Sequence, residues 1–110
     1  MNNVNICVVG AGYWGKNHIK TLDDLGALGG IVDSDNSILN SLKKNFPQIT
    51  TFNNLDDALS KNIFSGFTVA TPADTHFEIA KKIIISGKSV LVEKPITLTI
   101  EDCEELVDLA

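Results

Sequence analysis

The feature that most constrains this chain is a glycine-rich turn directly after a short apolar run. Residues 4–9 are rich in β-branched side chains, which is typical of a strand buried on both faces. The next six residues, Gly10-Ala11-Gly12-Tyr13-Trp14-Gly15, have the spacing G-x-G-x-x-G. From Gly15 to Gly26 apolar positions recur at helical spacing. Strand, turn and helix together predict the first unit of a nucleotide-binding α/β sheet.

Apolar strands alternate with amphipathic helical stretches along the rest of the chain. We expect strands at residues 4–9, 27–32, 50–52, 67–70 and 89–92, with helices at 15–26, 38–46, 55–59, 75–86 and 99–110. The pattern predicts an α/β fold, a doubly wound parallel sheet of the Rossmann type with strand order 3-2-1-4-5. No strand follows the last helix. We therefore expect a domain truncated before its sixth strand.

Composition narrows the function classes. With 110 residues, 44% of them hydrophobic and 21% charged, the chain suits one globular dinucleotide-binding domain over residues 1–110. The net charge is −5 and every basic residue is a lysine, which argues against a nucleic-acid partner. No apolar run is long enough for a membrane span. Cys7 and Cys103 lack metal-ligand spacing and no secretory signal is present, so we expect no metal site and a cytoplasmic protein.

Each motif glycine has an expected role in cofactor binding. Gly10 would make the tight turn, Gly12 would let the backbone approach a pyrophosphate, and Gly15 would let the helix pack closely. Tyr13 and Trp14, between the last two glycines, would cover the cofactor or contact a further domain. The alternatives are a tight turn that binds no ligand and an exposed pair of turn aromatics.

An aspartate at the end of the second strand indicates which cofactor is bound. Asp33 lies 18 residues after Gly15, where a dinucleotide site places an acid that accepts hydrogen bonds from the adenosine ribose. The alternative is that an aspartate here opens a turn or caps the next helix, a role that suits Asp35 better. An acid repels the 2′-phosphate of NADP, and the chain has no arginine to bind one. We expect NAD, with NADP disfavoured.

Further candidates follow the fourth and fifth strands. Thr71-Pro72 ends the fourth strand, where ligands bind in open parallel sheets. In the next helix, Thr75 and Glu78 have the spacing of a capping box, and His76 faces either the cleft or solvent. Glu93-Lys94 follows the fifth strand, and a desolvated lysine there can take part in proton transfer. The alternative for that pair is a salt-bridged strand end.

With these residues in place, the chain resembles the glucose-fructose oxidoreductase and inositol dehydrogenase family, Gfo/Idh/MocA, from Val4 to its end. The resemblance rests on three blocks in the family's order, which are residues 8–15, residues 69–76 and residues 90–95. It implies a two-domain NAD(P)-dependent dehydrogenase acting on a sugar, sugar nucleotide or cyclic polyol. It also implies that Lys94 is catalytic and that Glu93 lies near the nicotinamide ribose. The implied cofactor site contains Gly10, Gly12, Gly15, Asp33, Thr71 and Pro72.

The resemblance also implies a carboxyl-terminal substrate domain that is absent from these 110 residues. We therefore expect the fragment alone to be inactive. Two other function classes stay open: a redox-sensing NAD-binding regulatory module, which would not need Glu93-Lys94, and an S-adenosylmethionine-dependent methyltransferase. Since the fifth strand would expose an unpaired edge, we expect a homo-oligomer. The other expected partner is a small sugar-like substrate.

Overall fold

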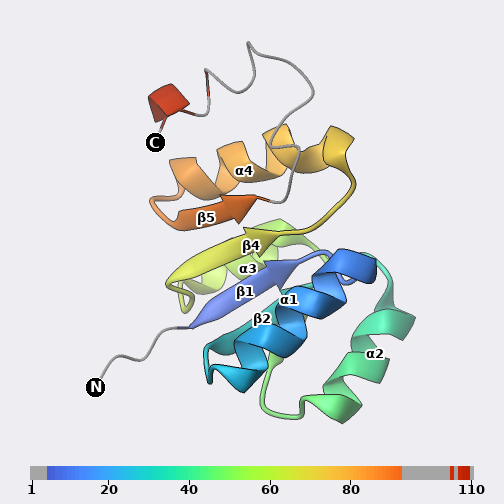
Figure 1. The fold of residues 1–110 in the computed structure, drawn as a ribbon. Coiled ribbons are helices and arrows are strands. Elements are labelled where there is room, and N and C mark those ends of the chain that lie inside the picture. Colours follow the sequence, from blue (N-terminus) through green and yellow to red (C-terminus); the bar gives the residue numbers. More distant parts are fainter. Residues whose placement is uncertain (1–4, 93–104, 106, 110) are drawn as a thin grey trace.

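A five-stranded parallel sheet forms the centre of the computed structural model, which describes residues 5–92, 105 and 107–109 (Figure 1). The strands are β1 (Ile6–Val9), β2 (Leu28–Val32), β3 (Thr50–Phe52), β4 (Gly66–Val69) and β5 (Ser89–Val92). All four strand pairs are parallel and the order is β3-β2-β1-β4-β5. The predicted fold class and strand order are confirmed.

The helices begin close to the positions that the sequence predicts. They are α1 (Tyr13–Asp24), α2 (Asn36–Asn45), α3 (Leu55–Lys61) and α4 (His76–Ile85), with a 3-10 turn, η1 (Ala73–Thr75), directly before α4. Glu105 and residues 107–109 are also helical. No helix in the described ranges is long and apolar enough to span a membrane.

Two apolar cores lie on opposite faces of the sheet. Figure 1 shows α1 and α2 on one face and α3 behind the strands on the other. The first core joins α1 and α2 to the sheet through Val8, Ala11, Ile19, Ile31, Leu39, Leu42 and Ile49. The second joins α3 and α4 to the other face through Cys7, Val9, Val32, Phe52, Ala58, Phe64, Phe67, Val69 and Ile83. Burial on both faces explains why the central strands are almost entirely apolar.

The strand register aligns the carboxyl ends of the central strands. Val9 of β1 lies opposite Val32 of β2 and Val69 of β4. The ladder continues one residue further, because Gly10 N–H donates to the Val32 carbonyl and Ala70 N–H donates to the Val9 carbonyl, both at 2.8 Å. Residues that directly follow these three strands therefore meet at one edge of the sheet.

Candidate cofactor site

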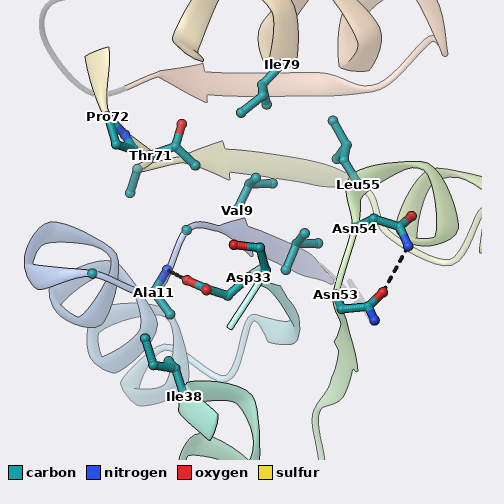
Figure 2. A pocket seen from close by; sticks show the side chains of 15 residues that line it. Val9, Ala11, Asp33, Ile38, Asn53, Asn54, Leu55, Thr71, Pro72 and Ile79 are labelled. Atoms are coloured by element: carbon teal, nitrogen blue, oxygen red, sulfur yellow. Dashed lines mark hydrogen bonds between the residues drawn. The ribbon is translucent and has the colours of Figure 1, made fainter. Parts of the chain in front are cut away.

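A pocket of about 410 Å³ opens at this edge (Figure 2). Its walls come from the last residues of β1 and β2, from the residues that follow β1, β2, β3 and β4, and from one residue each of α2, α3 and α4. The lining residues are Val9, Gly10, Ala11, Gly12, Val32, Asp33, Ser34, Ile38, Asn53, Asn54, Leu55, Ala70, Thr71, Pro72 and Ile79. Five predicted cofactor residues, Gly10, Gly12, Asp33, Thr71 and Pro72, thus lie around one pocket.

The three motif glycines differ in what surrounds them. Gly10 has φ +97°, and a Cβ there would lie 2.9 Å from Thr71 Cγ2. A Cβ on Gly15 would collide with the Gly10 carbonyl oxygen, so α1 packs closely on the turn. A Cβ on Gly12 would meet no atom within 4 Å, because this position faces open space. The close helix contact expected at Gly15 is therefore present, and the open space at Gly12 leaves room for a ligand.

The amino terminus of α1 suits an anion. Gly12 is its N-cap residue, no side chain caps it, and its first turn holds no acid. By contrast, Asp35 caps α2 and Asn54 caps α3 through side-chain oxygens. The backbone N–H groups that open a helix need acceptors, and a pyrophosphate can provide them. The open space at Gly12 and the uncapped helix therefore fit the phosphate portion of a dinucleotide.

Asp33 links two loops and also lines the pocket. Its Oδ2 accepts the Ala11 N–H at 2.8 Å, drawn as a dashed line in Figure 2, and its Oδ1 accepts the Asp35 N–H at 2.8 Å. An ionised carboxylate offers about four acceptor sites, so it can also accept hydrogen bonds from ribose hydroxyls. Asp35 caps α2 by accepting the N–H groups of Ser37 and Ile38 at 2.9 and 3.3 Å, as predicted.

The segment from Thr71 to His76 corrects two expectations. The predicted capping box of Thr75 and Glu78 is wrong, since the Thr75 side chain makes no capping hydrogen bond to α4. Instead its Oγ1 lies 2.6 Å from both Thr71 Oγ1 and the Pro72 carbonyl oxygen, because η1 turns the hydroxyl back onto the loop. The solvent alternative for His76 is also wrong, and the side chain does not line the pocket either. Its side chain is 2% exposed, and its Nε2 lies 2.7 Å from the Thr71 carbonyl oxygen.

Some predicted site residues lie partly or wholly outside the described part of the chain. Tyr13 and Trp14 open α1, but their side chains fall outside it. Glu93 and Lys94 lie entirely outside the described residues, directly after β5.

The sequence interpretation missed several pocket residues. Asn53 and Asn54 directly follow β3, so the rule that places ligands at carboxyl strand ends could have found them. Ile79 of α4 packs against the core and also reaches the pocket. Within the described residues, no cluster of three or more His, Cys, Asp or Glu side chains is placed to hold a metal ion.

Comparison with known proteins settles the family. Residues 4–110 match GFO_IDH_MocA, described as an oxidoreductase family with an NAD-binding Rossmann fold. The chain belongs to the Gfo/Idh/MocA oxidoreductase family. This membership confirms the resemblance that the three sequence blocks indicate, and it agrees with the glycine turn and acid found at the sheet edge.

Three Gfo/Idh/MocA relatives illustrate the similarity. The oxidoreductase sll0816 of Synechocystis sp. is 33% identical over 98% of this chain, which spans 30% of that protein. GenD2 from gentamicin A biosynthesis, crystallised with NAD, is 33% identical with a TM-score of 0.91, and the match covers 100% of this chain and 32% of GenD2. The UDP-N-acetylglucosamine 3-dehydrogenase GnnA from Acidithiobacillus ferrooxidans is 25% identical with a TM-score of 0.89. This match covers 100% of this chain and 34% of GnnA. The chain thus spans about a third of the length of these relatives.

Proposed function

We propose that residues 1–110 are the NAD-binding domain of a dehydrogenase that transfers a hydride between NAD and a hydroxyl-bearing carbon of a sugar-like substrate. The observation that carries the proposal is the pocket in which the Asp33 carboxylate and the open position at Gly12 lie together. A ribose and a pyrophosphate are the two parts of a dinucleotide that need these features.

The charges around the pocket favour NAD over NADP. Asp33 lines the pocket, and a 2′-phosphate on the adenosine ribose would lie against its negative charge. Lys43 and Lys44 belong to the last turn of α2, whereas the first turn of that helix follows Asp33. The Lys43 ammonium also donates to the Ile49 carbonyl. Neither lysine is therefore placed to replace the arginine that commonly binds this phosphate.

The roles of the cofactor and of the protein in the proposed reaction follow from the chemistry of alcohol oxidation. A secondary alcohol loses a hydride from carbon and a proton from oxygen. When bound, NAD supplies the hydride acceptor. The described residues would bind and orient the cofactor: α1 and Gly12 would hold the phosphates, and Asp33 would hold the adenosine ribose. On the basis of the family resemblance, we propose that Lys94 assists removal of the proton from the alcohol oxygen. The same resemblance places Glu93 near the nicotinamide ribose.

The substrate class rests on the relatives. GnnA is a dehydrogenase of UDP-N-acetylglucosamine, and GenD2 belongs to the biosynthesis of gentamicin A. GnnA supports a sugar nucleotide as the substrate. The family resemblance extends the proposed class to a sugar or a cyclic polyol. Because the chain spans about a third of their length, we expect it to bind cofactor without turning over substrate.

Calorimetric titration of the chain with NAD, NADP and S-adenosylmethionine tests the proposal. Saturable binding of NAD, with NADP at least about tenfold weaker, is the expected result. Binding of S-adenosylmethionine alone would favour the methyltransferase class and contradict the proposal. A redox-sensing module would also bind NAD, so that class needs a different test. The test is substrate-dependent NADH production by a protein that joins this domain to a substrate domain, and its loss in the Lys94→Met variant.

A further inference from the structure

The carbonyl and the hydroxyl of Thr71 both contact residues that do not line the pocket. The Thr71 carbonyl oxygen lies 2.7 Å from His76 Nε2, and its hydroxyl oxygen lies 2.6 Å from Thr75 Oγ1. The methyl group faces the other way, since a Cβ on Gly10 would lie 2.9 Å from Thr71 Cγ2. Thr71 therefore presents its methyl group to the glycine turn, across the pocket from Ile38 (Figure 2).

Counting protons defines the direction of these hydrogen bonds. The Thr75 hydroxyl has one proton and two oxygen neighbours at 2.6 Å. Both contacts contain a proton only if Thr75 donates to the Pro72 carbonyl while Thr71 donates to Thr75 Oγ1. The Thr75 backbone N–H also donates to the Pro72 carbonyl, at 2.9 Å. The Thr71 hydroxyl proton is thus used inside the loop.

The imidazole of His76 provides a hydrogen-bond donor for the Thr71 carbonyl. A carbonyl oxygen only accepts hydrogen bonds, so His76 Nε2 must carry a proton in this contact. The ring is 2% exposed and is therefore held in place by packing. Without this donor the Thr71 carbonyl would need another partner, and rotating the peptide to reach one would move Pro72.

We infer that Thr75 and His76 are positioning residues that keep Thr71 and Pro72 as an apolar wall of the cofactor pocket, packed against Gly10. The inference rests on the proposed function and deepens it. Neither residue lines the pocket, so each acts on the cofactor through the loop. A wall of methyl and pyrrolidine carbons suits an apolar edge of the dinucleotide and offers no hydrogen bond to a phosphate.

Two matched pairs of substitutions test this inference. Thr75→Val and His76→Leu remove the hydrogen bonds and keep a similar volume, whereas Thr75→Ser and His76→Gln retain a hydroxyl and an N–H donor. NAD affinity measured by calorimetry should fall about five- to tenfold in Thr75→Val and His76→Leu. Thr75→Ser and His76→Gln should recover most of the affinity, because the loop hydrogen bonds are restored.

A measurement without cofactor checks the arrangement itself. The ¹⁵N resonances of the His76 imidazole should show a proton on Nε2. The backbone amide hydrogen at position 75 should exchange with solvent faster in Thr75→Val than in Thr75→Ser. A proton on Nδ1 alone would overturn the inference. A loss of NAD affinity that follows the melting temperature equally in all four variants would also overturn it, since that pattern indicates general destabilisation.

The results separate the inference from the proposed function. If the unsubstituted chain binds NAD and the Thr75→Val and His76→Leu variants bind it equally well, the inference fails while the proposed function stands. If the unsubstituted chain binds no NAD, the proposed function fails and the cofactor role of this loop fails with it.

Discussion

The backbone N–H of Ala11 donates a hydrogen bond to Asp33 Oδ2 at 2.8 Å, across a sequence separation of 22 residues. This bond joins the glycine turn after β1 to the end of β2. The other oxygen of Asp33 accepts the Asp35 N–H at 2.8 Å, so the same carboxylate also orders the start of α2. Asp33 is therefore held in a fixed orientation at the pocket before any ligand arrives.

Replacing Asp33 should affect cofactor binding more than folding. Asp33→Ala removes the acceptor for the ribose and for Ala11, so NAD affinity should fall by about 1–3 kcal/mol, roughly five- to 150-fold. Asp35→Ala is the matched control, because it removes the cap of α2 at a cost of about 1 kcal/mol in stability but keeps the backbone N–H that Asp33 accepts. Calorimetry and thermal unfolding measure the two effects. Equal NAD affinity in Asp33→Ala and the unsubstituted chain would contradict the assignment.

Alanine substitutions at two motif glycines should separate binding from stability. Gly12→Ala places a methyl group in open space, so the melting temperature should stay nearly unchanged while NAD binding weakens. Gly15→Ala forces a Cβ onto the Gly10 carbonyl and should cost about 1–3 kcal/mol of unfolding free energy. Thermal unfolding with and without NAD measures both. Loss of stability in Gly12→Ala without loss of binding would be the opposite of the expected result.

Much of this site could be predicted because its signals are local in sequence. The turn from Gly10 to Gly15 and the acid at Asp33 directly follow strands, and parallel strands bring their carboxyl ends to one edge. The behaviour of Thr75 could not be predicted this way. Its hydroxyl can cap its own helix or bond to Thr71, and only the path of the 3-10 turn decides between them.

The pKa of the Cys7 thiol makes stability depend on pH. Cys7 is fully buried in the middle of β1, and its burial raises the pKa of the thiol. The folded chain then keeps the proton at pH values where the unfolded chain loses it. This contribution to stability is fully present below the unfolded thiol pKa of about 8.5, and it is lost as the pH rises above that value, by up to about 1.4 kcal/mol per pH unit.

Denaturant unfolding between pH 7 and 10 measures this effect. The unsubstituted chain should lose more stability over that range than Cys7→Ala, which lacks the thiol but should be less stable at pH 7 because of the cavity it creates. Identical slopes for the two proteins would show that Cys7 ionises equally in the folded and unfolded chains.

The edge of the sheet at β5 should promote self-association. Among the described residues β5 pairs only with β4, and the Leu91 side chain is 60% exposed. Unpaired strand edges and exposed apolar side chains favour contact with another chain. Since five of the last ten residues are acidic, association should increase with ionic strength as their repulsion is screened.

Analytical ultracentrifugation across a salt series tests this expectation, with Leu91→Lys as the comparison. The lysine should shift the equilibrium toward monomer, because it places a charge on the exposed apolar strand. A chain that stays monomeric at every salt concentration would show that the β5 edge does not associate.

Phe64 shows why part of the core could not be predicted. It lies outside every helix and strand, yet it is 2% exposed and packs edge to face against Phe52 and Phe67, with ring centroids 5.9 and 5.7 Å away. A Cβ on Gly30 would lie 2.5 Å from its ring, so that glycine makes room for the phenyl group. These contacts join three separate segments, and no local periodicity encodes them.

The most direct test of the central claim is an NMR titration of the ¹⁵N-labelled chain with NAD. The account predicts that the amides of Ala11, Gly12 and Asp35 shift and saturate together, because they surround the Asp33 carboxylate and the turn that receives the pyrophosphate. The amides in the last turn of α2 should stay in place, since they lie at the far end of that helix. Saturable shifts confined to other elements, or no shifts at millimolar NAD, would contradict the account.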